Sequence, residues 1–189
     1  FKQFETMQNQ ISELIPRIGS NNTITNKQKF NINIFLNEQC KDAINFSDFI
    51  ENIQLSHEDL RNNAQLGFVQ GMTKIINDNL NQSTLHQRPL YCTDKKRETM
   101  YIRDEDAWNK EKEKAKKKIF EGIQELSRKG IQELMEWKNI NPEYDNMDSN
   151  FSKFCMAVQK ETLAGENREK YYKKVLNNIQ ETTHLTSNE

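Results

Sequence analysis

Residues 56–80, SHEDLRNNAQLGFVQGMTKIINDNL, decide the fold class of this chain. Ser56 is a good helix N-cap, and Asp59 stands three residues later, where a capping box has Glu or Gln. This pattern predicts a helix that starts at Ser56 and ends near Gly67. The next helix shows one apolar face, with the spacing of an amphipathic helix, formed by Phe68, Met72, Ile75, Ile76 and Leu80.

Shorter elements are predicted upstream of this pair. Ser47 can cap a helix that ends at Ile53, and Asn37 can cap another that ends at Ile44. Before them, apolar residues alternate with asparagine, which predicts a short strand or an extended docking segment, with Phe30, Ile32, Ile34 and Leu36 on its apolar side.

The apolar period changes from 3.6 to 2 after Pro89. Residues 90–93 (LYCT) and 99–102 (TMYI) are rich in strand-forming types, and DKKRE lies between them. This arrangement predicts a β-hairpin with a basic tip. The acidic run 104–106 follows, and we expect Asp106 to cap the next helix, which has Trp108 at its start.

Three further helices are indicated downstream. The first carries Ile119, Ile123 and Leu126 and either continues past Gly130 or bends there, until Asn141-Pro142 ends it. The other two cover residues 151–158 and 172–179, with Gly165 between them, and the last ten residues are expected to fray. The predicted fold class is mainly α with a small β-hairpin (α+β), in which helices precede a winged-helix-like hairpin.

The N-terminal residues follow the a/d spacing of a short coiled coil, with apolar positions at Phe4, Met7, Ile11, Leu14 and Ile18. Two heptads are marginal alone, so this segment either ends a longer oligomerising helix or docks on the domain. The expected organisation is an oligomerisation helix (1–18), a linker (19–29), a helical domain with the hairpin (30–142) and a C-terminal helical pair with a tail (143–189).

Composition and motifs exclude several classes of function. The three cysteines are far apart and show no Cys-x-x-Cys spacing, so we expect free buried thiols and no metal site. No apolar run approaches the roughly 18 residues that a membrane span needs. No P-loop or dinucleotide-binding turn is present, and His57, His86 and His184 lack a catalytic context. We expect no enzyme activity, no cofactor and no small-molecule substrate.

Basic residues are concentrated in the hairpin and the helix after it. Residues 95–118 contain ten basic and six acidic side chains, although the whole chain has a net charge of -1. The order of the predicted helices and the hairpin resembles that of a winged helix. In that arrangement the helix from Phe68 is expected in the recognition position, and the hairpin tip is expected to contact phosphate. The expected phosphate-binding residues are Lys95, Lys96, Arg97, Arg103, Lys116, Lys117 and Lys118, of which the last three form an unpaired run. Alternating charges are also typical of an ordinary solvated helix face.

Two strings carry a family resemblance: residues 35–50, FLNEQCKDAINFSDFI, and residues 88–102, RPLYCTDKKRETMYI. With the Trp108-x-Lys110 that follows, they resemble the C-terminal region of uncharacterised proteins of large nucleocytoplasmic DNA viruses, in the mimivirus-like and algal groups. Many such proteins carry a Cys/His finger and a coiled coil ahead of this region, and Phe1 in place of Met fits a chain that continues upstream. The finger is absent from this sequence, so the resemblance implies no zinc site and no finger-based nucleic-acid binding for this chain.

The resemblance implies an intracellular setting, in the host cytoplasm or viral factory, or in the virion. The leading hypothesis is an oligomerising viral module that docks DNA, RNA or an acidic protein through the basic hairpin and helix. The alternative is a minor virion or scaffold component that acts only through protein contacts.

Overall fold

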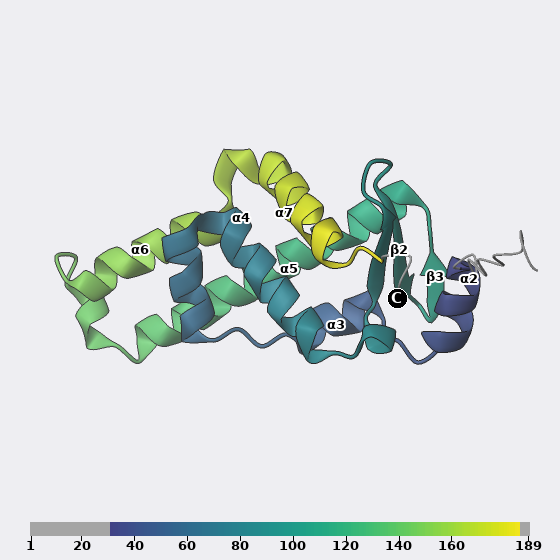
Figure 1. Cartoon of the computed structure of the whole chain (residues 1–189). Coiled ribbons are helices and arrows are strands. Elements are labelled where there is room, and N and C mark those ends of the chain that lie inside the picture. The colour runs from purple at the N-terminus through teal and green to yellow at the C-terminus, as the bar shows by residue number, and fades with distance from the viewer. Residues whose placement is uncertain (1–30, 186–189) are drawn as a thin grey trace, which may run out of the picture. The chain divides into compact units, whose positions relative to one another are not determined.

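The computed structural model describes residues 31–185, and those from Ile32 onward belong to one compact unit (Figure 1). The expected coiled-coil positions Phe4 to Ile18 lie outside the described residues, as does the linker at 19–29. The helices are α2 (Ile32–Ile34), α3 (Phe46–Asn52), α4 (His57–Gln82), α5 (Lys112–Asn139), α6 (Asn150–Leu163) and α7 (Arg168–Thr182). The strands are β1 (Leu90–Asp94), β2 (Thr99–Asp104) and β3 (Ala107–Asn109).

The described part is therefore mainly helical with a small antiparallel sheet, and the α+β class is confirmed. The strand order is β1-β2-β3. The predicted hairpin is present: Tyr91 pairs with Tyr101, and the register shifts between Cys92 and Asp94. The third strand was not predicted, and Trp108 lies in it opposite Arg103 rather than at a helix start. Asp106 caps no helix, because α5 begins after Glu111.

The capping box at the start of α4 is confirmed. The Asp59 amide donates to Ser56 Oγ, and the Ser56 amide donates to the Asp59 carboxylate at 2.8 Å. Gly67 has φ of +77° and breaks α4 into two helical halves, as the sequence predicts. A residue with a Cβ is strained in this left-handed region, so glycine suits the kink.

The upstream expectations were partly wrong. Residues 32–39 form α2 and a π-helical turn (Phe35–Gln39) instead of a strand. The reason is that the neighbours Phe35 and Leu36 are both buried, whereas successive residues of a strand face opposite sides. No helix runs from Asn37 to Ile44, because the chain turns at Cys40. The next helix, α3, begins after Asn45 rather than Ser47.

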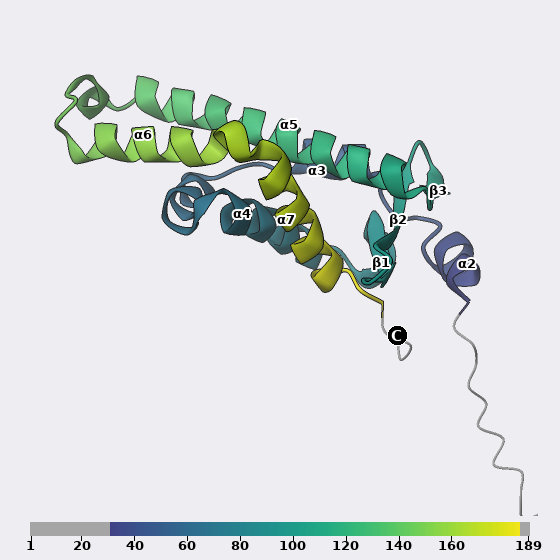
Figure 2. The ribbon, with the colours of Figure 1, turned by 90° about the horizontal axis from the view of Figure 1, so that it is seen from above.

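Helices α5 and α6 form an antiparallel hairpin, and α4 and α7 lie along one side of it (Figure 2). Helix α5 passes Gly130 without a break and ends before Asn141-Pro142. The α6–α7 turn uses left-handed backbone at Ala164 and Gly165. The C-terminal helical pair thus packs in the same unit as the rest of the described helices.

The main core lies between α3, α4, α5, α7 and the sheet, with Ile76, Leu90, Ile119 and Ile179 fully buried. A second cluster joins Phe35, Leu36 and Cys40 to Tyr91 and Leu185, and a third fills the α4–α5–α6 layer around Trp137. The expected frayed end is wrong for residues 180–185, because residues 180–182 belong to α7 and residues 183–185 pair with β1. The Cys92 amide donates to Thr183 O at 3.0 Å, and the Leu185 amide donates to Cys92 O at 2.9 Å.

Candidate nucleic-acid interface

The tip of the β1–β2 hairpin presents three adjacent cations. Lys95, Lys96 and Arg97 are all exposed, and the Arg97 amide donates to Asp94 Oδ1 at 3.0 Å to close the turn. The Arg97 guanidinium lies 3.8 Å from Asp94 and is 86% exposed. Among the described residues, neither lysine has a carboxylate within ion-pair distance, so both ammonium groups are open to an outside anion.

Glu98 joins this tip to α5. Its carboxylate lies 2.5 Å from Lys112 Nζ. The hydrogen bond from Lys112 lowers the pKa of Glu98 below its ordinary value, although desolvation alone would raise it. The positive charges of Lys112, Lys116 and Lys173 lower the pKa further. One carboxylate of the hairpin therefore lies within the field of lysines from both α5 and α7.

Aromatic packing explains why α7 reaches this place. Lys116 Nζ lies 5.7 Å from the Phe120 ring centroid, and Phe120 meets Tyr172 edge to face at 5.4 Å. The residue after Tyr172 is Lys173, which is exposed. We call the six residues Lys95, Lys96, Arg97, Lys112, Lys116 and Lys173 the basic face.

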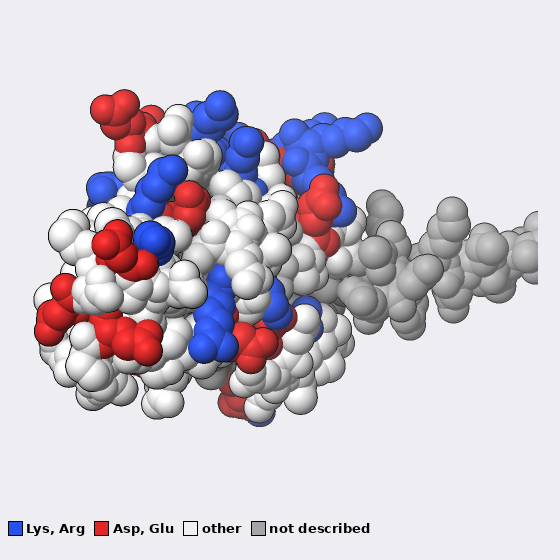
Figure 3. Space-filling view, turned by 90° about the vertical axis from the view of Figure 1, so that its left-hand side faces the viewer, with Lys and Arg blue, Asp and Glu red and all other residues white. Residues whose placement is uncertain are grey.

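Helix α7 extends the positive charge beyond the basic face. Its Lys170, Lys173 and Lys174 line a shallow hollow of about 490 Å³, together with Glu166, Asn167, Glu169 and Asn177. Figure 3 shows blue side chains gathered along its upper edge, the side on which Figure 1 places the hairpin tip and α7.

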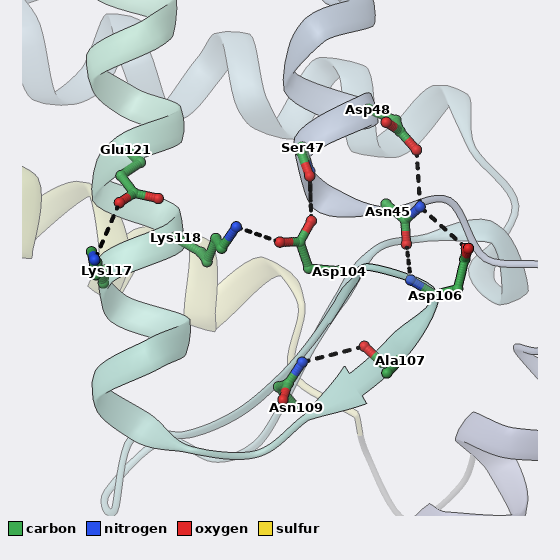
Figure 4. Close-up of polar contacts among 10 residues, drawn as sticks. All are labelled: Asn45, Ser47, Asp48, Asp104, Asp106, Ala107, Asn109, Lys117, Lys118 and Glu121. Carbon is green, nitrogen blue, oxygen red and sulfur yellow. Dashed lines mark hydrogen bonds and ion pairs between the residues drawn. The ribbon is translucent and has the colours of Figure 1, made fainter.

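Lys118 has a different environment from the one expected. Its ammonium lies 2.5 Å from Asp104 Oδ2 (Figure 4), and the Asp104 side chain is only 5% exposed. Ser47 also donates to this carboxylate, through its hydroxyl and its amide. Burial alone would raise the pKa of Asp104, but the hydrogen bonds from Lys118 and Ser47 hold it below its ordinary value. Lys118 thus connects α5 to β2 and α3.

The predicted unpaired run 116–118 is wrong, because each lysine has an acidic neighbour. Lys116 lies 3.8 Å from Glu113, and Lys117 lies 3.8 Å from Glu121. Lys117 is 77% exposed and turned toward its own helix, so its ion pair is weak.

Arg103, another expected phosphate-binding residue, does not lie at the exposed tip of the β1–β2 hairpin. Its side chain is 13% exposed, and Nη2 lies 3.6 Å from Asp106 Oδ1. Asp106 in turn accepts from Asn45 Nδ2 at 3.2 Å, and its amide donates to Asn45 Oδ1 at 2.9 Å (Figure 4). The acidic run 104–106 therefore fastens the β2–β3 turn to α3, and it does not complement the dipole of α5.

Residues with catalytic or metal-binding chemistry are scattered in the described part of the chain. Among residues 31–185, no three of the His, Cys, Asp and Glu side chains are grouped to hold a metal ion. Cys40, Cys92 and Cys155 are free and buried, as expected. His57 stacks on Trp137 with ring centroids 4.0 Å apart, and its Nε2 lies 3.2 Å from Glu133.

Two members of the basic face were absent from the predicted site, Lys112 and Lys173. Lys112 belongs to the basic run that the sequence shows. Lys173 could have been suspected from the spacing of Lys170, Lys173 and Lys174, which share one helix face at i, i+3 and i+4. Its proximity to Glu98 has no local signal, because the two residues are far apart in sequence.

Within residues 31–185, no helix is both long and apolar enough to cross a membrane. The chain matches no known family model, no curated protein and no solved structure.

Proposed function

We propose that this chain is a non-enzymatic binding module that docks the phosphate backbone of nucleic acid through the basic face. The observation that carries the proposal is the grouping of Lys112 and Lys116 of α5 and Lys173 of α7 around the carboxylate of Glu98, directly after the exposed cations of the hairpin tip. Phosphate groups release counterions when lysine and arginine neutralise them, so such a face gives salt-dependent affinity.

Contacts to phosphate suit this face better than contacts to bases. The tyrosines of the hairpin, Tyr91 and Tyr101, are 1% and 7% exposed, so neither can stack on a base. Binding through lysine and arginine alone carries no base readout. The expected ligand is therefore duplex or structured nucleic acid of any sequence.

Of the winged-helix-like arrangement, the proposal uses only the wing, which is the β1–β2 hairpin. The second half of α4 would be the recognition helix, but its Phe68, Met72 and Ile76 are buried. On its outer side, Lys74 lies 2.5 Å from Asp78, and this local pair lowers the positive charge available for DNA. The hairpin tip therefore makes the contact in our proposal, and α4 supports it from the core.

The resemblance to proteins of large nucleocytoplasmic DNA viruses supplies the proposed setting, a viral factory or a virion. Oligomerisation through Phe4, Met7, Ile11, Leu14 and Ile18 would multiply weak phosphate contacts. The second candidate function is a virion or scaffold component that acts only through protein contacts. It is favoured by the exposed apolar side chains on α5 and α6, such as Met135 and Met156.

The test is fluorescence anisotropy of a labelled duplex of about 20 base pairs at about 50 mM and about 200 mM salt. The variant is Lys95→Glu/Lys96→Glu/Arg97→Glu, for which we expect affinity to fall at least about tenfold at low salt, with a shallower salt dependence. The matched control is Lys41→Glu/Lys153→Glu/Lys160→Glu, which makes the same charge change at exposed positions outside the basic face.

Equal losses in the two triple variants would mean that only net charge matters, and the basic face would not be the site. Absence of duplex binding by the unmodified chain at low salt would remove the nucleic-acid function and leave the protein-contact alternative.

A further inference from the structure

Most of the exposed large apolar side chains of the described structure lie on the α5–α6 hairpin. Seven large hydrophobic residues are exposed among the described residues. Five lie on the α5–α6 hairpin, namely Met135, Ile140, Met147, Met156 and Leu163, and Leu66 lies at the kink of α4. The seventh is Ile34. Ile140 and Met147, in the connection between α5 and α6, are 74% and 76% exposed.

These side chains do not belong to an unfinished core. The inner side of the α5–α6 hairpin is already filled by Leu134, Trp137, Cys155 and Val158, which pack with Leu60 of α4. Trp137 also meets Phe151 and Phe154 edge to face at 5.4 Å. The exposed methionines and Ile140 are therefore extra apolar surface that folding of the described residues leaves in contact with water.

The same end of the molecule is acidic. Exposed carboxylates stand beside Met135, Ile140 and Met147 at Glu136, Glu143, Asp145 and Asp148, and residues 139–152 contain no lysine or arginine. Met156, farther along α6, lies between the exposed Lys153 and Lys160 and does not belong to this acidic end. Lys138 is engaged internally, with its ammonium 4.6 Å from the Tyr144 ring centroid and 3.5 Å from Gln159 Oε1. Figure 3 looks onto this end and shows red side chains toward its lower left, among broad uncoloured areas.

We propose that this acidic apolar end, defined by Met135, Ile140 and Met147 with the carboxylates Glu136, Glu143, Asp145 and Asp148, docks a basic amphipathic helix of a partner protein. Unbranched methionine side chains adapt to different apolar partners. An amphipathic helix presents apolar residues at i, i+3, i+4 and i+7, and lysine or arginine beside that stripe would meet the carboxylates.

A second copy of the chain fits this end less well. Its basic face has the complementary charge, but the only exposed large hydrophobic residues of the described part outside the α5–α6 hairpin are Ile34 and Leu66, and neither belongs to the basic face. Ion pairs alone would leave Ile140 and Met147 in water. A helix that is both basic and apolar satisfies the two properties together.

The probe is a fluorescein-labelled peptide of about 14 residues, made only of leucine and lysine in a helical amphipathic order. Its control has the same composition in an order without an apolar face. Measured by anisotropy with the full chain at about 150 mM salt, the amphipathic peptide should bind at least about tenfold more tightly than the control peptide.

The double variant Ile140→Ser/Met147→Ser should weaken the amphipathic peptide at least about tenfold, whereas Ile34→Ser should leave its affinity unchanged. All three side chains are exposed, so their replacement spares the core. Equal binding of the two peptides, no binding of either, or equal affinity of the double variant and the unmodified chain would each overturn the proposal. Duplex binding in the double variant reports on the basic face separately, so the two proposals can fail independently.

Discussion

The ammonium group of Lys129, in the middle of α5, lies 3.0 Å from the carbonyl oxygen of Ile53, just beyond the end of α3. It also donates to Ile50 O at 3.0 Å and to Glu51 O at 2.5 Å. The last carbonyls of a helix lack intrahelical donors and carry partial negative charge. A lysine from a distant helix thus completes the C-terminus of α3.

Replacement of Lys129 by methionine should therefore destabilise the fold. Methionine keeps most of the side-chain volume but removes all three donors, and we expect a loss of about 2 kcal/mol, since hydrogen bonds to a charged group contribute more than neutral ones. Urea unfolding measures it. Arg128→Met is the control, because within residues 31–185 Arg128 pairs only with Glu125 on its own exposed helix face. If both variants lose the same stability, capping of α3 by Lys129 is not the cause.

The pairs of Lys118 and Lys117 should differ in strength although the residues are neighbours. Lys118→Met leaves the carboxylate of Asp104 buried without its ammonium partner, which should cost about 2 kcal/mol. Lys117→Met removes a pair that is mostly in water and should cost less than about 0.5 kcal/mol. Chemical denaturation of the two variants gives the comparison, and a smaller loss for Lys118→Met than for Lys117→Met would contradict the structural role of Lys118.

Asp104 should make stability depend on acid pH. Its pKa is lower in the folded chain than its ordinary value, so the unfolded state binds the proton first as pH falls. The contribution of Asp104 is complete above its ordinary pKa of about 4 and is lost as pH falls through the lower folded value. The unmodified chain should lose more stability between about pH 5 and about pH 3 than Asp104→Asn does. Urea unfolding at both pH values tests this, and identical slopes would exclude the linkage.

Gly71 should not tolerate even alanine. A Cβ there would lie 1.8 Å from Asn63 Oδ1 and 2.9 Å from the Asn63 Cα, which the kink at Gly67 brings against the second half of α4. We expect Gly71→Ala to destabilise by about 3 kcal/mol, in the upper range of overpacking. In Gly130→Ala the nearest atom is Thr162 Cγ2 at 3.2 Å, and helix propensity offsets part of the strain, so its change should stay within about 1 kcal/mol. Thermal unfolding of both variants provides the check, and equal Tm values would refute the close approach.

Local pattern in the sequence determined the elements whose residues carry their own signal. Ser56 and Asp59 cap α4 through contacts three residues apart, Gly67 permits the kink, and the period of two after Pro89 marks the hairpin. The apolar spacing of α5, α6 and α7 was readable for the same reason: it depends on neighbours within two helical turns.

Only the tertiary structure decided which distant residues meet. The helical turn at Phe35 and the attachment of residues 183–185 to β1 depend on partners more than 50 residues away in sequence. The strand around Trp108 pairs with β2, and its indole packs on Tyr91 of β1. The same holds for the candidate site. The sequence predicts that Lys118 binds phosphate, but in the structure Lys118 pairs with the buried Asp104, which Ser47 also contacts. Lys173 belongs to the basic face because Tyr172 packs on Phe120. In the sequence, a lysine that faces water and a lysine that faces a buried carboxylate cannot be told apart. Their surroundings are determined by how α5 packs against the sheet and α7, which depends on residues far apart in the chain.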